Sequence, residues 1–236
     1  MNAYTFPPGE PPSVTVAGCG QRFPVHRIYC IGRNYADHVR EMGADPKRDP
    51  PVFFMKPADA VVENGASIPY PPATANLHHE IELVVALGGG GRDIPVPQAL
   101  GCVFGYAAGN DLTRRDLQQA AKERGAPWDA AKGFDQSAPL AAIRPAAQGH
   151  PGRGRIWLSV NGVLRQDSDV GEMLWDVPHV IAALSRLYTL KAGDLIFTGT
   201  PAGVAALRPG DRVEGGIEGL EVLRHSIAPP QHGACP

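Results

Sequence analysis

The amino-acid sequence predicts a mainly β fold with short helices, organised as one domain of mixed β architecture. Gly (28 residues) and Pro (24 residues) together exceed one residue in five, which favours many short strands joined by turns. Hydrophobic residues make up 43% of the 236 residues and charged residues 19%, the composition of an ordinary globular domain. Because mainly β chains of this length often form one core, we expect a single domain over residues 25–228. An N-terminal arm (1–24) and a C-terminal tail (229–236) are expected to flank it.

The strands are predicted from short runs that are apolar, or that alternate between polar and apolar residues, and that end at turn-forming residues. In chain order these runs cover 13–17, 27–31, 52–55, 60–68 (with a turn), 80–87, 102–108, 156–160, 163–166, 195–198, 212–217 and 221–227. The run at 80–87 alternates at its start and then becomes wholly apolar, so its first half has one special face. Asn161-Gly162 gives the strongest hairpin signal, because both residues tolerate the positive φ of a tight type I′ turn.

The helices are predicted from capping residues and from helical spacing. The segments concerned are 35–42, 97–100, 113–123 and 178–187. Asn34 can cap the first of these helices, and Gly43 and Gly125 are expected to end the first and the third. The polar, Pro-bearing segment 46–51 is expected to be a mobile loop.

The composition argues against several classes of partner. The net charge is -2 and no basic run with interleaved aromatic residues occurs, so we expect neither nucleic acid nor a membrane as partner. No segment approaches 18 apolar residues and residues 1–12 lack a secretory signal pattern, so we expect a soluble, cytoplasmic protein. No two cysteines form a C-x-x-C pair, which argues against structural zinc and a disulfide framework. The cysteines are Cys19, Cys30, Cys102 and Cys235.

Two glutamates separated by one residue suggest a metal site. Glu80 and Glu82 lie in the predicted strand 80–87, and the two-residue period places both carboxylates on one face. A divalent cation would relieve their repulsion, although a solvated strand face is the commoner reason for such a pair. Asp111 strengthens the metal hypothesis, because it follows an almost wholly apolar strand where a lone charge is costly. Three carboxylates suit an open octahedral site for Mg²⁺ or Mn²⁺, which Ca²⁺ can also occupy.

Other side chains are candidates for catalysis. His38 and Glu41 are three apart on the predicted helix, so the carboxylate can orient the imidazole as a general base; an exposed helix pair is the alternative. Lys132 can pair with a carboxylate or hold a substrate, although a surface lysine is the commoner outcome. His78-His79 can supply one metal ligand at most, since neighbours in a strand face opposite sides. The sequence has no phosphate-binding loop and no G-x-S-x-G elbow.

The chain resembles the fumarylacetoacetate hydrolase family in an ordered set of motifs that spans about residues 25–227. The matching motifs are Gly32-Arg33-Asn34-Tyr35, Ala36-Asp37-His38, Lys56-Pro57, His79-Glu80-Ile81-Glu82-Leu83, Asn110-Asp111-Leu112-Thr113, Arg115-Asp116, Trp128, Lys132, Phe134, Asn161-Gly162 and Thr198-Gly199-Thr200-Pro201-Ala202-Gly203-Val204. The likeness is strongest to the small, single-domain fumarylpyruvate and acylpyruvate hydrolases. Because the motifs occur in order along most of the chain, they are far more specific together than any one motif alone.

The resemblance implies a mixed β-sandwich roll, a homodimer and a hydrolase that acts on carbon–carbon bonds in ketonic substances. It implies that Glu80, Glu82 and Asp111 bind Mg²⁺ or Mn²⁺, and that His38 and Glu41 form a catalytic dyad on a lid. The further implied substrate contacts are Lys132 on the oxyanion side and Arg115, Gln118 and Thr200 near the α-keto acid end.

The expected substrate is fumarylpyruvate, a β-diketo acid whose hydrolysis to fumarate and pyruvate belongs to gentisate (aromatic) catabolism. Its second carboxylate should bind a further cation near the lid. Arg33 and Arg40 are the candidates for this substrate-binding cation. The alternatives that share enolate chemistry are an acylpyruvase, an oxaloacetate decarboxylase and a 2-hydroxymuconate-type isomerase or decarboxylase. A non-catalytic binding module is an alternative of another class, but every matching ligand and dyad position is present.

Overall fold

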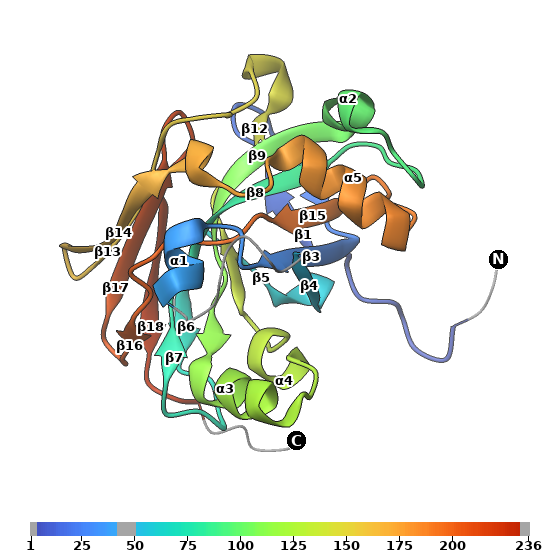
Figure 1. Cartoon of the computed structure of the whole chain (residues 1–236). Helices are drawn as coiled ribbons and strands as arrows, with labels where there is room; N and C mark the ends of the chain where they lie inside the picture. Colours follow the sequence, from blue (N-terminus) through green and yellow to red (C-terminus); the bar gives the residue numbers. More distant parts are fainter. Residues whose placement is uncertain (1–3, 42–50, 232–236) are drawn as a thin grey trace.

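Strands dominate the fold, as predicted. The structure, a computed structural model, describes residues 4–41 and 51–231. Within these residues the largest sheet has the strand order β4-β3-β15-β8-β9-β11-β5, and β12 also pairs with β9. Its strands are β3 (Arg27–Gly32), β4 (Val52–Lys56), β5 (Val61–Glu63), β8 (Ile81–Leu87), β9 (Val103–Asn110), β11 (Ala138–Leu140), β12 (Arg144–Pro145) and β15 (Asp194–Phe197). Figure 1 shows β8 and β9 as long, curved strands that cross the molecule, so this sheet curls around the core.

A second sheet packs against the first, and two small strand groups complete the β structure. The second sheet has the order β14-β13-β17-β18-β6. Its strands are β6 (Ser67–Pro69), β13 (Arg155–Val160), β14 (Val163–Asp169), β17 (Arg212–Ile217) and β18 (Leu223–Ala228). The small groups are β1 (Ser13–Thr15) with β2 (Arg22–Pro24), and β10 (Thr113–Arg114) with β7 (Leu77–His78) and β16 (Ala206–Leu207). The two packed sheets give the expected roll of mixed β structure.

The helices are short and lie outside the sheets (Figure 1). The α-helices are α1 (Ala36–Glu41), α2 (Val96–Ala99), α3 (Arg115–Arg124), α4 (Asp129–Lys132) and α5 (Val177–Leu187). Single 3₁₀ turns are η1 (Ala58–Ala60), η2 (Leu100–Cys102), η3 (Ala146–Gln148) and η4 (Val170–Glu172). The helices α3 and α4 lie together at one end of the molecule, and α1 lies in front of the central strands. Among the described residues, no helix has the length and apolar character that a membrane crossing requires.

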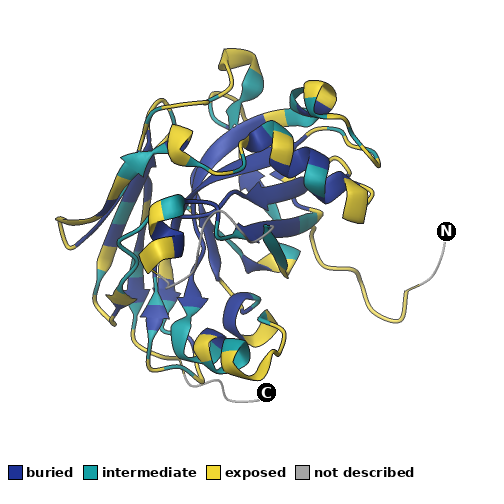
Figure 2. Cartoon of the chain, in the orientation of Figure 1, coloured by how far each residue is buried: buried dark blue, intermediate teal, exposed yellow. Residues whose placement is uncertain are grey.

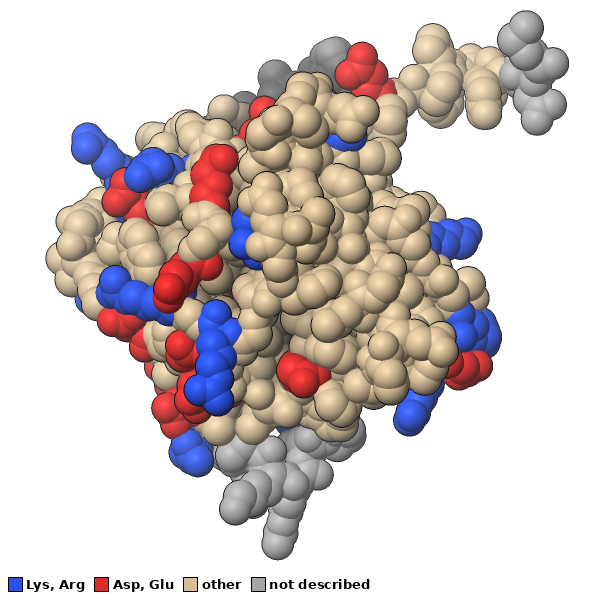
Figure 3. All heavy atoms as spheres, turned by 90° about the horizontal axis from the view of Figure 1, so that it is seen from above, with Lys and Arg blue, Asp and Glu red and all other residues tan. Residues whose placement is uncertain are grey.

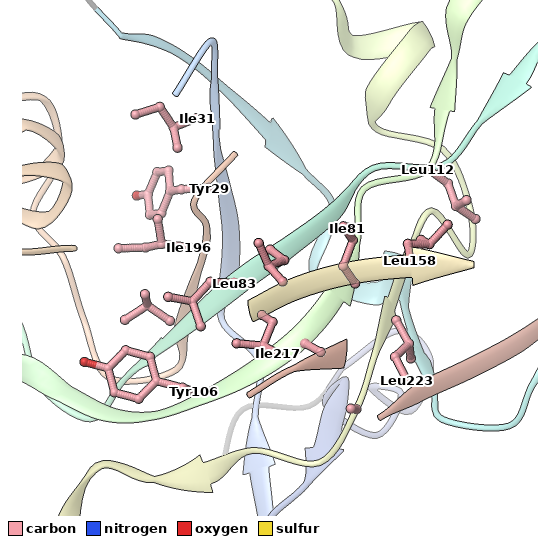
Figure 4. Packing of buried hydrophobic residues seen from close by; sticks show 14 of the residues in the cluster. Tyr29, Ile31, Ile81, Leu83, Tyr106, Leu112, Leu158, Ile196, Ile217 and Leu223 are labelled. Atoms are coloured by element: carbon pink, nitrogen blue, oxygen red, sulfur yellow. The ribbon is translucent and has the colours of Figure 1, made fainter. Parts of the chain in front are cut away.

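The strand β8 lies between two hydrophobic clusters, and the burial of the central strands is evident in Figure 2. Ile81 and Leu83 belong to the larger cluster, whereas Val84 belongs to the smaller one. Figure 4 shows Ile81 and Leu83 among side chains from both sheets, including Ile217 of β17. Because side chains alternate along a strand, Glu82 shares the face of Val84. The sequence therefore puts a carboxylate at the end of an otherwise apolar strand face.

Several local predictions are confirmed and several need correction. The Asn161-Gly162 turn has φ values of 52° and 78°, and Gly125 ends α3 with φ 63°. The helix predicted over 113–123 begins two residues late, because residues 113–114 pair with β7 as β10. The run 60–68 holds two strands in different sheets, since β5 pairs with β11 and β6 pairs with β18.

Some predictions fall partly or wholly outside the described residues. These are the last residue of the helix 35–42, its stop at Gly43, the loop 46–51 apart from Pro51, the end of the tail and Cys235. On the face shown in Figure 3, acidic and basic side chains are intermingled, in keeping with the near-neutral charge.

Candidate active site

Three carboxylates converge where β8 begins and β9 ends. Glu82 lies in β8, Glu80 directly precedes that strand, and Asp111 directly follows β9. The antiparallel pairing of the strands joins them, and the backbone N–H of Asp111 donates to the carbonyl of Glu80 at 2.8 Å. Oxygen atoms of all three carboxylates lie within 4.8 Å of one another, and all three side chains are buried. The common alternative, a solvated strand face, is therefore wrong here.

Three cationic side chains neutralise the cluster. The Lys132 ammonium lies 2.9 Å from Glu80 Oε2 and 2.6 Å from Asp111 Oδ2. Lys56 Nζ lies 2.8 Å from Asp111 Oδ1, and Arg115 forms an ion pair with Glu80. Lys132 is only 2% exposed, so the commoner expectation of a surface lysine is wrong. Because buried charges require partners, these cations make a metal-free cluster tolerable.

The charge is nevertheless unevenly compensated. Burial and the repulsion of Asp111 and Glu80 raise the pKa of Glu82 well above its usual value. Burial also acts to raise the pKa of Glu80, but the attraction of Lys132 and other cations outweighs it and lowers that pKa. Glu82 accepts a hydrogen bond from the backbone N–H of Gly199 at 2.7 Å, whereas Asp111 Oδ1 has the Lys56 ammonium at 2.8 Å as its partner. Three converging carboxylates, with repulsion that raises the pKa of Glu82, fit a divalent cation that prefers hard oxygen ligands, such as Mg²⁺ or Mn²⁺.

A histidine–glutamate pair lies on the same side of the molecule. His38 Nδ1 and Glu41 Oε2 are 3.1 Å apart on α1, and His38 is buried. The Gly203 N–H donates to both oxygens of Glu41 at 3.2 and 3.3 Å, which fixes the carboxylate from outside the helix. Burial lowers the pKa of His38 despite the opposing effect of the nearby carboxylates, so the imidazole is neutral at pH 7. His38 is thus not exposed as the alternative expected, whereas Glu41 is.

A cavity of about 230 Å³ connects these groups. Eight of the ten site residues predicted from the sequence line it, namely Arg33, His38, Glu80, Glu82, Arg115, Gln118, Lys132 and Thr200. The other two, Glu41 and Asp111, contact lining residues. Arg40 does not line the cavity, since it is exposed and pairs with Asp37 at 2.5 Å on the outer face of α1.

Two further residues of α3, which were not among the predicted site residues, also line the cavity. Gln119 and Lys122 share one helix face with Arg115 and Gln118, at positions i, i+3, i+4 and i+7. Helical spacing counted from Arg115 is the sequence signal that could have identified Gln119 and Lys122. Burial, followed by repulsion from Arg115 and Arg33, lowers the pKa of Lys122 to about 8.

The histidines beside the glutamates have other partners. His79 Nδ1 lies 2.9 Å from Gln166 Oε1, and His78 Nε2 lies 2.9 Å from Asn76 Oδ1. Among the described residues, the group that could hold a metal consists of the three carboxylates alone.

Known proteins resemble this chain over most of its length. The family described as fumarylacetoacetate (FAA) hydrolase C-terminal matches residues 27–228. The structure of the fumarylpyruvate hydrolase from Pseudomonas aeruginosa in complex with Mn²⁺ and pyruvate matches with a TM-score of 0.95 and 50% identity, covering 96% of this chain and 99% of that one. The fumarylpyruvate hydrolase from Ralstonia sp is 42% identical over 179 residues, which cover 76% of this chain and 93% of that protein. The human mitochondrial oxaloacetate tautomerase FAHD1 is 42% identical over 206 residues, 87% of this chain and 93% of that protein.

These matches agree with the fold and with the carboxylate cluster. They confirm the predicted fold class and the predicted enzyme class, a hydrolase acting on carbon–carbon bonds in ketonic substances. The Mn²⁺ of the solved neighbour, together with the buried cluster, confirms the expectation of a divalent metal cofactor. With the ordered motifs, the curled sheets and the match over 27–228 in agreement, this chain belongs to the fumarylacetoacetate hydrolase family.

Proposed function

We propose that the chain hydrolyses a β-diketo acid, with fumarylpyruvate as the preferred substrate and fumarate and pyruvate as products. The observation that carries this proposal is the cavity that joins the buried carboxylate cluster to the His38–Glu41 pair. Glu80, Glu82 and Asp111 are the proposed ligands of Mg²⁺ or Mn²⁺. Support comes from the Pseudomonas aeruginosa fumarylpyruvate hydrolase, whose structure holds Mn²⁺ and pyruvate.

The two ends of the cavity suit the two parts of the reaction. The divalent cation, when bound at the cluster, supplies Lewis-acid stabilisation of negative charge at this end. Arg115 and Gln118 face the same region and offer N–H donors to the α-keto acid end of the substrate. With its keto acid end bound there, we expect the substrate to lie with its 4-oxo carbon toward His38.

His38 is the proposed general base. Its Nδ1–H donates to Glu41, which leaves Nε2 as the acceptor that takes a proton from water. Because burial keeps the imidazole neutral, this acceptor is available at pH 7. Glu41 orients the ring and stabilises the imidazolium that forms, as a carboxylate beside a catalytic histidine does.

Lys132 is the proposed contact on the side of the developing oxyanion. Its ammonium also bonds to the Thr113 hydroxyl oxygen at 2.6 Å, which fixes its position between Glu80 and Asp111. Although burial acts to lower it, the pKa of Lys132 is raised by Asp111 and Glu80, so the ammonium stays charged. Its three N–H bonds point to Glu80, Asp111 and Thr113, so from this fixed position it is the positive charge of the ammonium that stabilises the developing oxyanion.

The bond changes balance with one water molecule. The hydroxide adds to the 4-oxo carbon, the C3–C4 bond breaks, and its electron pair passes to the pyruvyl fragment as an enolate. The imidazolium of His38 returns its proton to C3, which gives pyruvate. The acyl fragment leaves as the carboxylic acid and ionises in water.

Replacement of His38 tests the proposal. In His38→Ala we expect kcat to fall by about 10²- to 10⁴-fold while Mn²⁺ affinity is retained, because the base is lost and the ligands are not. Loss of the β-diketo-acid absorbance of fumarylpyruvate measures turnover, and calorimetry measures Mn²⁺ binding. His179→Ala is the matched control, since His179 pairs with Asp176 at 2.6 Å on the exposed side of α5. Full activity in His38→Ala contradicts the assignment of the base.

Oxaloacetate tautomerisation is the second candidate function, favoured by the 42% identity to the human oxaloacetate tautomerase FAHD1. Keto–enol exchange moves a proton to or from C3, so it uses His38 as a base without attack by water. Parallel assays with fumarylpyruvate, acetylpyruvate and oxaloacetate separate the two candidates. The proposal also retains the expected homodimer, which light scattering of the purified protein tests directly.

A further inference from the structure

One face of α3 forms a polar row along the cavity. Arg115, Gln118, Gln119 and Lys122 all line the cavity, and their spacing places them on one side of the helix. Arg115 anchors the row at the carboxylate cluster through its ion pair with Glu80. Lys122 lies seven residues further on, about 10 Å along the helix axis. The row therefore extends from the proposed metal site along the wall of the cavity.

Lys122 differs from the other cavity lysine in its partners. Lys132 is held by two carboxylates, whereas no carboxylate in the described part of the chain forms an ion pair with Lys122. Its ammonium lies 5.5 Å from the centre of the Trp128 ring, and its nearest charged neighbours include Arg115 and Arg33. Lys122 thus gives this part of the cavity wall a positive charge, and an anion bound to it would displace no carboxylate of the described residues from an ion pair with Lys122.

The dimensions match a substrate with an acidic group at each end. A seven-carbon diketo dicarboxylic acid in extended form spans about 8 Å, given C–C bonds of about 1.5 Å. With its keto acid end at the carboxylate cluster, its other carboxylate reaches the level of Lys122 on α3. The Phe54 and Trp128 rings, 5.8 Å apart between centroids, also line the cavity and give an apolar wall for the unsaturated carbon chain between the two ends.

We propose that Lys122 determines specificity by binding the carboxylate of the substrate that is distant from its keto acid end. The proposal rests on the proposed function for the identity of the substrate. It assigns the role of the distal cation to α3, rather than to the exposed Arg40 of α1. It also gives the enzyme a preference for dicarboxylic over monocarboxylic diketo acids.

The test compares two substrates that share the diketo acid end. Fumarylpyruvate has the distal carboxylate and acetylpyruvate lacks it. In Lys122→Met we expect the ratio of kcat/KM for fumarylpyruvate to kcat/KM for acetylpyruvate to fall by about 10- to 100-fold, mainly through KM. Lys122→Arg should restore most of the ratio, since it keeps the charge. Lys191→Met, which removes an exposed lysine elsewhere, should leave both values as in the parent protein.

If Lys122 had only a structural role, its replacement would not change the ratio of the two kcat/KM values. If Lys122→Met lowers kcat/KM equally for both substrates, or leaves the ratio intact, the proposal is overturned. Unfolding temperature and Mn²⁺ affinity of the variant show that fold and metal site remain.

A binding measurement tests the carboxylate site at Lys122 independently of whether the protein hydrolyses fumarylpyruvate. Calorimetry with the Mn²⁺-loaded protein compares fumarate with crotonate, which carries a methyl group in place of one carboxylate. We expect tighter binding of fumarate, and loss of this preference in Lys122→Met. This result supports the carboxylate site even if the parent protein does not hydrolyse fumarylpyruvate, in which case only the proposed function fails. An equal preference in parent and variant overturns the carboxylate site.

Discussion

Glu82 carries the least compensated charge of the carboxylate cluster. No cation forms an ion pair with it in the described part of the chain, and its hydrogen-bond donor is the backbone N–H of Gly199. Burial and the neighbouring Asp111 and Glu80 raise its pKa. For an acid, a folded-state pKa above the unfolded value means that ionisation at neutral pH opposes folding. Metal binding needs Glu82 ionised, whereas the stability of the metal-free protein favours its neutral form.

Glu82→Gln should stabilise the metal-free protein and abolish its response to metal. The amide oxygen can still accept from Gly199, while the repulsion is removed, so we expect an unfolding temperature about 2–4 °C higher, on the order of 1 kcal/mol. Thermal unfolding with and without Mn²⁺ measures both effects. Glu10→Gln on the exposed arm is the control. A Mn²⁺-dependent rise in Glu82→Gln equal to that of the parent protein would remove Glu82 from the ligand set.

Lys122 should impose a pH limit on the use of dicarboxylic substrates. Burial and then the neighbouring Arg115 and Arg33 lower its pKa to about 8, so the ammonium charge is present below pH 8 and lost as the pH rises through this value. The charged groups that act on it are Arg33, Arg115, Glu80 and Lys132. We expect the fumarylpyruvate to acetylpyruvate ratio of kcat/KM to fall between pH 7 and pH 9. Lys122→Arg should give a flat ratio, because a guanidinium stays charged in this range; a fall that persists in this variant refutes the assignment.

Single site residues could be predicted from the sequence where their position would be energetically unfavourable without a partner. Glu80, Glu82 and Asp111 stood out because charges beside apolar strands need compensation. Lys122 did not stand out, because its environment depends on how α3 packs against distant residues of the cavity. For the same reason the residues around Lys132 left a surface position as the commoner expectation, and only the family resemblance placed this lysine at the site.

The helix α1 depends on a loop from another part of the chain. Glu41 is held by the N–H of Gly203, in the loop between β15 and β16. Gly203 has φ 97°, and a Cβ atom there would lie 2.1 Å from the carbonyl oxygen of Arg165. The loop therefore fits this position only while residue 203 has no side chain.

Gly203→Ala should impair catalysis through α1 without touching the metal site. The loop must shift to relieve the clash, which displaces the donor to Glu41 and loosens the orientation of His38. We expect kcat to fall by about 10-fold, stability to fall by about 1–3 kcal/mol, and Mn²⁺ affinity to stay the same. Gly210→Ala is the control, since Gly210 has φ 94° but no atom within 4 Å of the added Cβ. Equal losses of kcat in the two variants would show backbone strain rather than the clash as the cause.

Helix ends and turns could be predicted where the residues that determine them are neighbours in the sequence. The hairpin turn at Asn161-Gly162 and the helix end at Gly125 follow from positive φ, which the sequence itself specifies. Residues 113–114 were assigned to a helix, because pairing with β7 depends on a partner 35 residues away that no local pattern reveals. The separation of β5 and β6 into two sheets is likewise a property of the packed molecule.

We expect the two sheets and their apolar clusters to hold the molecule together before a metal binds. β8 contributes apolar side chains to both clusters, and the charges at its start are balanced by Lys132, Lys56 and Arg115. Folding energy therefore comes from the apolar clusters, and the carboxylate cluster is tolerated rather than required.

Removal of divalent metal should leave the molecule folded. After treatment with a chelator we expect an unchanged circular dichroism spectrum and a cooperative thermal transition. Saturation with Mn²⁺ at about 100 times its dissociation constant should then add about 2.7 kcal/mol, or roughly 5–10 °C. Loss of the cooperative transition on chelation would show that the apolar clusters do not suffice.

The three cations around the carboxylates also determine the order in which the protein folds and binds its metal. Since Lys132, Lys56 and Arg115 neutralise the cluster in the folded chain, folding need not wait for metal delivery. The ion would enter a finished protein, and it could be withdrawn and replaced by another divalent ion. The identity of the resident metal would then follow the supply of free Mg²⁺ and Mn²⁺ in the compartment, because ligands of the same hard-oxygen kind suit both ions.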